Sequence, residues 1–216
     1  MLELGLKTLI GYLLGSIVGA LVVGRLRGVD IRTLGSGNAG GTNALRTQGL
    51  GFAAVTVVID VGKGWIAARW LPGLAIPGVA ADPAIARDWL TACCAAAAVA
   101  GHVWPMWYGF RGGKGGATLA GVLLALAPVL LGIALVAWFL VALFTGYAGL
   151  ATVTAAATVA AATGLSPLAT RPWHVFALAM ALLVAWAHRA NFARMRAGTE
   201  ARLTRLWLFR PRSAGR

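Results

Sequence analysis

The sequence ATLAGVLLALAPVLLGIALVAWFLVALFT occupies residues 117–145, and this stretch decides how many helices the fold contains. Pro128 interrupts the apolar run, because proline removes a helical hydrogen bond and disfavours helix at the residue before it. The stretch is therefore either one kinked span or a short helix followed by a full one, meeting at Ala127–Pro128. The first alternative gives six membrane spans in the whole chain, and the second gives seven.

The other apolar runs show what kind of protein contains this stretch. They lie at 4–24, 50–70, 85–101, 147–164 and 173–190, and a span needs about 20 residues. Of the 216 residues, 59% are hydrophobic and 12% are charged, whereas a soluble domain is about 45–50% apolar and about 25% charged. An ordinary soluble globule is excluded. We expect one membrane-embedded domain, residues 1–216, with a basic cytoplasmic tail from about residue 201.

The distribution of basic residues selects between six and seven spans. Fourteen of the 19 Lys and Arg residues fall in the segments 25–49, 101–116 and 189–216, and segment 71–84 has none. Basic segments favour the cytoplasmic side of a membrane. Placing all three segments there requires an odd number of spans. We therefore predict an all-α bundle of about seven transmembrane helices, with the N-terminus outside, the C-terminus cytoplasmic, and 117–127 short, tilted or partly re-entrant.

The net charge of +13 raises the question of whether the chain binds nucleic acid. Such binding needs a solvent-facing basic domain or stripe, and no loop here is long enough. Cys93 and Cys94 are adjacent in an apolar run, without the spacing of a metal or disulfide framework. We expect no nucleic-acid partner and no metal site.

The first polar segment, Leu34–Arg46, is rich in glycine. It has four glycines within residues 35–41, so that successive backbone N–H groups can surround an anion. A helix beginning near Thr42 would direct its N-terminus at the same anion. Neutral donors follow from the side chains of Ser36, Asn38, Thr42 and Asn43, and Arg46 adds a positive charge. A flexible turn is the alternative interpretation.

The second polar segment, Gly101–Thr118, surrounds one cation with glycines. Gly112, Gly113, Gly115 and Gly116 flank Lys114. The pattern is not a Walker A loop, because Tyr108 stands where its first glycine is required and Gly115 follows the lysine. It predicts phosphate binding without nucleotide hydrolysis.

The third polar segment is His188–Glu200. His188, Asn191 and Arg194 are spaced three apart and share a helix face. A basic flank after the last span is the alternative interpretation. Glu200 lies within a basic tail, where we expect it to orient an Arg or Lys.

Two further ionisable positions lie outside these segments. Asp60 and Lys63 are three residues apart inside an apolar run, where charges are costly and need partners. We predict a mutual ion pair in preference to a catalytic role. His174 is expected to be structural.

The three polar segments, placed at one membrane face beside an apolar body, indicate lipid chemistry with phosphate groups. A nucleophile is not indicated, since Ser36 does not lie in a Gly-x-Ser-x-Gly elbow. No histidine is followed by an aspartate five positions later, which excludes that acyltransferase arrangement.

Together the segments resemble the three motifs of the acyl-phosphate:glycerol-3-phosphate acyltransferases, the PlsY family of bacterial membranes. The resemblance covers essentially the whole chain, and Asp60–Gly64 shares it. Gly116 departs from it mildly, because an aliphatic residue is usual there. The resemblance implies transfer of a fatty acyl group from acyl phosphate to the sn-1 hydroxyl of glycerol 3-phosphate, giving lysophosphatidic acid and phosphate. It implies no cofactor, a seven-span bundle, and the bacterial inner membrane with a cytoplasmic active site.

The resemblance and the residue chemistry together assign roles. We expect Arg46, Lys114 and His188 to hold the phosphate of glycerol 3-phosphate, and Ser36 and Asn191 to orient its hydroxyls. The acyl-phosphate group would be cradled by Asn38, Thr42, Gly112, Gly113 and Gly115. The predicted substrate-binding set is completed by Asn43, His102, Thr118, Arg194 and Glu200. Either His102 or the leaving phosphate takes the proton.

A transporter or flippase for a phosphorylated solute or lipid is the competing hypothesis. It also explains the basic glycine-rich segments, but it favours duplicated halves with a site near mid-membrane, and the chain has no internal duplication. Acyl-chain preference and oligomeric state are left open, with a monomer acceptable.

Overall fold

The computed structural model describes residues 1–167, 169–204 and 206–209, and within these ranges its only regular elements are helices, with no strand. Four arginines of the basic tail, Arg205, Arg210, Arg212 and Arg216, lie outside the described residues. The α-helices are α1 (Leu2–Gly15), α2 (Gly19–Leu26), α3 (Gly41–Gln48), α4 (Leu50–Arg69), α5 (Arg87–Val103), α6 (Gly116–Leu126), α7 (Pro128–Thr145), α8 (Ala148–Gly164), α9 (Arg171–Ala187) and α10 (Arg189–Arg196). Short 3-10 turns lie at Ile31–Thr33, Leu71–Gly73 and Met106–Tyr108.

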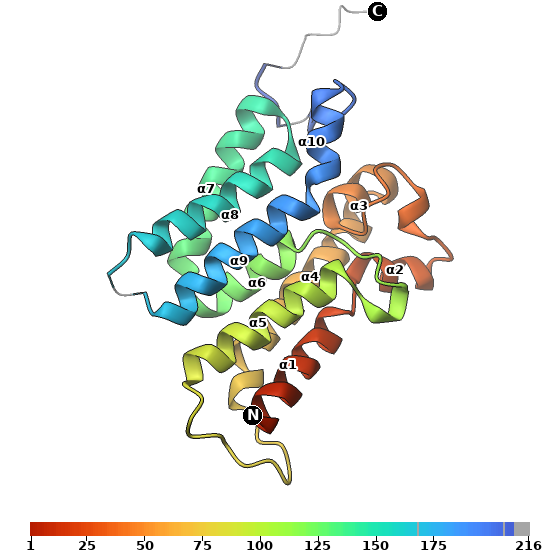
Figure 1. Ribbon diagram of the computed structural model, residues 1–216. Coiled ribbons are helices and arrows are strands. Elements are labelled where there is room, and N and C mark those ends of the chain that lie inside the picture. The colour runs from red at the N-terminus through yellow and green to blue at the C-terminus, as the bar shows by residue number, and fades with distance from the viewer. Residues whose placement is uncertain (168, 205, 210–216) are drawn as a thin grey trace, which may run out of the picture.

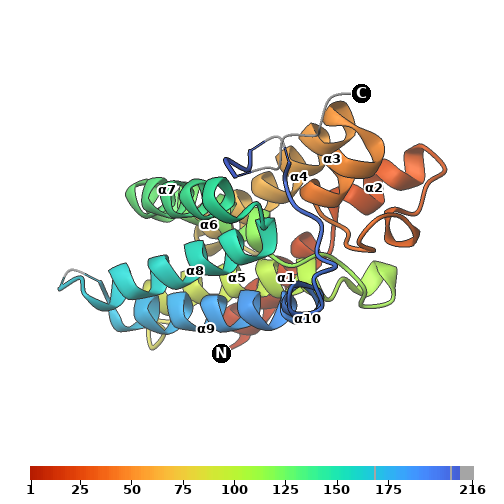
Figure 2. The same ribbon diagram turned by 90° about the horizontal axis from the view of Figure 1, so that it is seen from above.

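The long helices form two layers (Figures 1 and 2). α4, α6 and α7 make one layer, and α1, α5, α9 and α8 make the other, with α7 packed on α8 where the layers meet. Small residues allow this close packing, as is usual between membrane helices. A Cβ at Gly15 would collide with the Ala98 backbone of α5, and one at Gly64 would collide with the Thr118 carbonyl of α6.

The apolar stretch 117–145 forms two helices. α6 ends at Leu126 and α7 begins at Pro128, so the prediction of a short helix followed by a full one is confirmed. Ala127 leaves the helical region, with φ −150° and ψ 66°. Proline suits the first turn of α7, because the N–H that it lacks would have no intrahelical partner there.

Three helices in the described ranges are long and apolar enough to cross a membrane: Leu50–Gly73 with its 3-10 extension, Arg87–Tyr108 likewise, and α7. The number rises to five if two bent pairs, α1 with α2 and α9 with α10, each count as one span. α6 and α8 are shorter apolar helices. These segments coincide in position with the predicted apolar runs.

The predicted continuous span at 4–24 is wrong in one respect. α1 ends at Gly15, α2 begins at Gly19, and the two are bent by 47°. The break has no proline. It is held instead by tertiary contacts, because Asp60 and Lys63 of α4 bond to backbone groups of Gly19 and Ile17.

The bundle has two unlike ends (Figure 1). At one end lie α3, α10 and the loops 27–40 and 104–115, and we call it the motif end. At the other lie the N-terminus, the loop 70–86, the end of α8 and the start of α9, and we call it the N-terminal end. The parts of the three basic segments that the structure describes lie together at the motif end.

Candidate active site

Asn43 organises the first glycine-rich loop. Its side-chain oxygen accepts from the Ser36 N–H at 2.9 Å, and its amide nitrogen donates to the carbonyls of Leu34 at 3.0 Å and Asn38 at 3.1 Å. The residue is 2% exposed. Since the amide is bonded to the loop, Asn43 holds the loop in shape, and it also lines the cavity described below.

The first turn of α3 faces a cavity. Gly40, Gly41 and Thr42 line that cavity, and α3 begins at Gly41. The first N–H groups of a helix have no intrahelical partner, and the helix dipole makes this terminus attractive to anions. The predicted helix start near Thr42 is therefore confirmed to within one residue, and Thr42 faces the cavity as expected.

In the second glycine-rich loop, the predicted roles of two glycines are wrong. The Gly112 N–H donates to the Val103 carbonyl at 3.2 Å, and the Gly113 N–H donates to the His102 carbonyl at 3.0 Å. Because both N–H groups are used within the chain, they cannot cradle a phosphate. These bonds instead fasten the loop to the end of α5.

Gly115, unlike Gly112 and Gly113, lies at the cavity. It lines the cavity as the N-cap of α6, with φ +83°, a left-handed conformation that favours glycine. Gly116 and Ala117 in the first turn of α6 line the cavity as well. Two helix N-termini, those of α3 and α6, thus converge on one cavity.

A series of polar contacts connects Lys114 to the third polar segment. Its ammonium donates to the Asn191 side-chain oxygen, and the Asn191 amide donates to Glu200 at 2.6 Å. Arg194 donates to the other Glu200 oxygen, also at 2.6 Å. The predicted role of Glu200, orienting an Arg or Lys, is confirmed for Arg194. This contact directs the Arg194 guanidinium at Glu200, and Arg194 is not among the residues that line the cavity.

The ammonium of Lys114 is easier to deprotonate than an ordinary lysine. Burial and the nearby charge of Arg194 lower its pKa to about 8, and Glu200 partly opposes this shift. The pKa lies close enough to neutrality for the charge of Lys114 to depend on pH.

His188 contributes one ring nitrogen to the cavity. It stands between α9 and α10, is 5% exposed, and its Nδ1 lies 2.8 Å from the Val184 carbonyl. A carbonyl oxygen only accepts, so Nδ1 carries a proton. Nε2 is the nitrogen left for a ligand, as an acceptor in the neutral ring or a donor in the charged one.

The cavity has a volume of about 640 Å³ and two kinds of wall. Its polar wall includes eleven of the fifteen predicted site residues, namely Ser36, Asn38, Thr42, Asn43, Arg46, His102, Lys114, Gly115, His188, Asn191 and Glu200. Its apolar wall includes Leu45, Leu50, Val57, Leu135, Trp138 and Leu206. A smaller apolar cavity of about 70 Å³, between α6, α7 and α8, shares Ala120, Leu135 and Trp138 with it.

Thr118 lies elsewhere, and its predicted contact with substrate is corrected. Its side chain is 0% exposed, and its carbonyl packs against Gly64 of α4. It contributes to the packing of α6 on α4 and does not line the cavity.

Sequence reasoning missed Asp60 as a residue of the cavity wall. The predicted pair with Lys63 is confirmed at 2.9 Å, but both residues also meet His102, which is far away in sequence. In the sequence Asp60 stands out only as an intramembrane charge, and this signal does not identify its distant partner His102. Within the described residues, no three His, Cys, Asp or Glu side chains are grouped to hold a metal ion.

The chain is similar to known proteins along most of its length. The family described as "Glycerol-3-phosphate acyltransferase" matches residues 6–198. A glycerol-3-phosphate acyltransferase of Rhodospirillum rubrum is 43% identical over 205 residues, covering 94% of this chain and 92% of that protein. One of Rubrobacter xylanophilus is 41% identical over 203 residues, covering 93% and 94%.

Two solved structures share the fold. Both are crystal structures of PlsY, described as an integral membrane glycerol 3-phosphate acyltransferase. Its glycerol 3-phosphate form matches with a TM-score of 0.80 and 31% identity, covering 92% of this chain and 94% of that one. Its lysophosphatidic acid form matches with a TM-score of 0.77, 30% identity and the same coverage.

Proposed function

The chain belongs to the glycerol-3-phosphate acyltransferase family, and from this membership we propose the reaction that it carries out. It transfers a fatty acyl group from acyl phosphate to the sn-1 hydroxyl of glycerol 3-phosphate. The products are lysophosphatidic acid and inorganic phosphate, in the first acylation step of phospholipid biosynthesis. The observation that carries the proposal is a single cavity that joins two helix N-termini, Arg46 and Lys114 to an apolar wall.

Glycerol 3-phosphate occupies the basic part of this cavity. Arg46 and Lys114 neutralise its phosphate, and charge-assisted hydrogen bonds of this kind are roughly twice as strong as neutral ones. His188 contacts the substrate through Nε2. Ser36 and Asn191 orient the hydroxyls, and the bond from Asn191 to Lys114 couples the two functions.

Acyl phosphate binds between the two helix N-termini. Asn38, Thr42 and Gly115 surround its phosphate, which the first-turn N–H groups of α3 and α6 attract. Its acyl chain lies along the apolar wall formed by Leu135, Trp138 and their neighbours. This arrangement places an amphipathic donor across the boundary between polar and apolar lining.

The reaction needs positioning and electrostatic stabilisation rather than a covalent enzyme intermediate. The sn-1 hydroxyl oxygen attacks the acyl carbonyl carbon, the bond from that carbon to the phosphate oxygen breaks, and phosphate leaves with the electron pair. The hydroxyl proton passes to the leaving phosphate. Fixed donors aimed at the developing negative charge, with both substrates held in register, supply the acceleration.

The membrane arrangement follows from the helix positions and the charge distribution. We place seven spans in the bacterial inner membrane: the bent pair α1–α2, the helices α4, α5, α6, α7 and α8, and the bent pair α9–α10. The N-terminus is outside and the motif end faces the cytoplasm, in a single acyltransferase domain spanning 1–216. Labelling single cysteines placed at residues 30, 78 and 198 in intact cells tests the arrangement, because only residue 78 should react from outside.

A reaction assay tests the function. Purified protein in detergent micelles, given a long-chain acyl phosphate, should release phosphate and form lysophosphatidic acid only when glycerol 3-phosphate is added. A flippase or transporter would show no such reaction and would instead move a phosphorylated solute or lipid across reconstituted vesicles. Phosphate release without glycerol 3-phosphate would point to a hydrolase and contradict the proposal.

A further inference from the structure

Three buried ionisable side chains meet at the cavity wall, Asp60 and Lys63 on α4 and His102 on α5, and two of them, Asp60 and His102, line the cavity. They are 1%, 3% and 2% exposed, respectively. Lys63 Nζ lies 2.9 Å from Asp60 Oδ1 and 2.9 Å from His102 Nδ1. The reaction proposed above assigns no step to this cluster, and burying three such groups in an apolar bundle is costly unless they are paired.

Part of the cluster's role is to hold the break in the first span. The Gly19 N–H donates to Asp60 Oδ1 at 3.0 Å, and Lys63 donates to the Ile17 carbonyl at 2.8 Å. These bonds satisfy one donor and one acceptor that the interrupted helix frees between α1 and α2. Asp60 Oδ2 has no hydrogen-bond partner among the described residues, so the contacts of this carboxylate run through Oδ1.

The geometry also determines the tautomer of His102. A charged lysine has three N–H donors and no acceptor, and the neighbours of Lys63 are Asp60 Oδ1, the Ile17 carbonyl and His102 Nδ1. Nδ1 must therefore accept. Its 3.3 Å approach to Asp60 Oδ1 is the longer contact, and a proton on Nδ1 would face the Lys63 ammonium. The proton of the neutral ring consequently lies on Nε2.

That proton faces the joint between the two glycine-rich loops. The His102 carbonyl accepts from the Gly113 N–H at 3.0 Å, and a Cβ on Gly113 would collide with His102 Nε2. The same Cβ would lie 2.9 Å from the Ala39 carbonyl oxygen of the first loop. Nε2 therefore packs against Gly113 where the two loops meet, and the hydrogen bond that fastens Gly113 to His102 runs through the backbone.

We propose that Asp60, Lys63 and His102 form a positioning network for the acyl-transfer site. Lys63 holds His102 in the Nε2–H tautomer. His102 in turn holds Gly113, and with it the adjacent Lys114, against the first loop. A histidine held as a donor on the loop side has no free lone pair there, so His102 acts as a support and not as a general base.

Histidine nitrogen shifts test the tautomer directly. The chain has three histidines, His102, His174 and His188. In protein carrying ¹⁵N-labelled histidine, the signals lost on His102→Gln identify this residue. We expect the Nε2–H pattern in the unsubstituted protein and a shift toward Nδ1–H in Lys63→Met. An Nδ1–H pattern in the unsubstituted protein would overturn the proposal.

Enzyme kinetics distinguish a positioning role of Lys63 from a role in stability alone. The matched control is Lys7, a second buried lysine. Lys7 is 4% exposed, pairs with Glu3 at 2.9 Å and donates to the Pro72 carbonyl at 2.7 Å, at the far end of the bundle. Lys63→Met should raise KM for glycerol 3-phosphate by about 10- to 100-fold, the size of a lost hydrogen bond to a charged group. Lys7→Met should destabilise the fold with kinetic constants within twofold. Equal kinetic effects in the two variants would overturn the proposal.

A second pair of variants, both at His102, allows the proposal to be tested even if Lys63→Met fails to fold. His102→Gln places an amide N–H near the position of Nε2, and His102→Asn places one near Nδ1. The glutamine variant should retain several-fold more activity than the asparagine variant, and its pH profile should keep its shape. A complete loss in His102→Gln at unchanged KM would indicate a base. The kinetic tests rest on the proposed function, but the nitrogen shifts do not, so the two can fail separately.

Discussion

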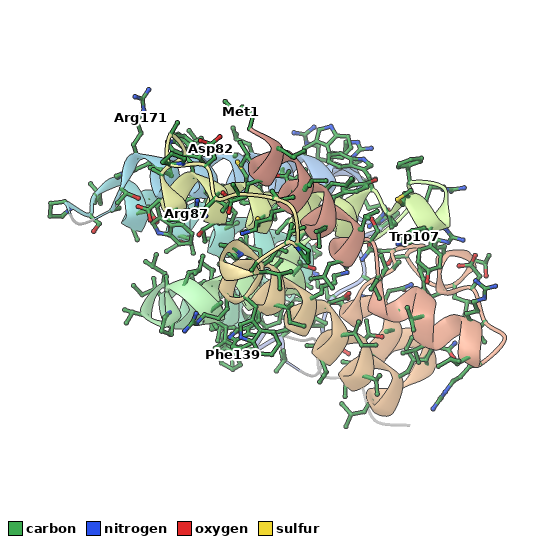
Figure 3. The ribbon with its side chains drawn as sticks, turned by 90° about the horizontal axis from the view of Figure 1, so that it is seen from below. Met1, Asp82, Arg87, Trp107, Phe139 and Arg171 are labelled. Carbon is green, nitrogen blue, oxygen red and sulfur yellow. The ribbon has the colours of Figure 1, made fainter. Side chains whose placement is uncertain are left out.

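Both ends of the bundle gather charged side chains, but the two ends use them differently. At the N-terminal end, Glu3 accepts from Lys7 at 2.9 Å, from Arg87 at 2.7 and 2.9 Å, and from the Asp82 N–H at 2.9 Å. Met1, Asp82 and Arg87 lie near one another there, far from Trp107 (Figure 3). Every charge of this cluster has a partner within the chain.

At the motif end, the positive charges that line the cavity keep unused capacity. Arg46 has no ion-pair partner among the described residues, and the ammonium of Lys114 is met by the neutral amide of Asn191. Two helix N-termini add further positive potential. Charges that are paired within the chain stabilise the fold, and charges beside a cavity that have no ion-pair partner are available to a ligand. The comparison therefore separates structural from functional basic residues better than the net charge does.

The largest loss of activity should follow from removing a cavity charge that has no ion-pair partner. Lys114→Met should lower kcat/KM for glycerol 3-phosphate by about 10²- to 10³-fold, as expected for loss of one fixed electrostatic contact. Thermal stability should hold or rise, because a half-buried charge is lost. Arg111→Gln is the control, since Arg111 is exposed on the same loop and outside the cavity lining. Equal losses in both variants would show that the cavity is not the site.

The complementary change removes a charge that is fully paired at the N-terminal end. Glu3→Gln keeps the shape of the side chain but leaves Lys7 and Arg87 without their carboxylate. We expect the thermal midpoint to fall by several degrees while kcat and KM stay within twofold. Asp88→Asn, at an exposed position of the same end, should change neither quantity. A kinetic defect in Glu3→Gln at a temperature where it is fully folded would break the contrast between the ends.

The positions of the helices follow from the sequence, but one of their breaks does not. Hydropathy locates the apolar runs, and Pro128 marks the boundary of α6 and α7 because its effect is local. The break at residues 16–18 has no local signal. Its backbone groups are satisfied by Asp60 and Lys63, more than 40 positions away, and such a contact is invisible to a reading of neighbouring residues.

The candidate site shows the same limit. Residue types identify the segments that gather at the cavity, because glycine, asparagine and basic residues suit an anion. They do not reveal which N–H groups the chain uses for itself. Gly112 and Gly113 fasten a loop to α5 while Gly115 lies at the cavity with φ +83°, and nothing in their sequence positions beside Lys114 tells these glycines apart. For the same reason Asn43, chemically suited to a ligand, is occupied by the loop.

The pH dependence gives a finer test of the charges at the motif end. Since the pKa of Lys114 is about 8, its ammonium is present below that pH and lost above it. We expect kcat/KM for glycerol 3-phosphate to fall by up to about tenfold per pH unit above 8. Arg194→Gln should move this decline to higher pH, because Arg194 lowers the pKa of Lys114. Glu200→Gln should move it to lower pH, because Glu200 raises that pKa. Shifts in the same direction would contradict the assignment.

The smallest expected effect concerns the apolar wall, which runs from the motif end toward the middle of the bundle. Ala120 lines both the main cavity and the smaller one between α6, α7 and α8. Ala120→Phe should fill the shared space and shift the preference toward shorter acyl phosphates. Each buried CH₂ contributes about 0.8 kcal/mol, so displacing one methylene should cost about fourfold in kcat/KM for the longer donor. Leu124→Phe, which is exposed on the same helix, is the control. Competition between two donors of different length measures the change. An unchanged preference in Ala120→Phe would place the acyl chain elsewhere on the bundle and confine the functional asymmetry to the polar loops.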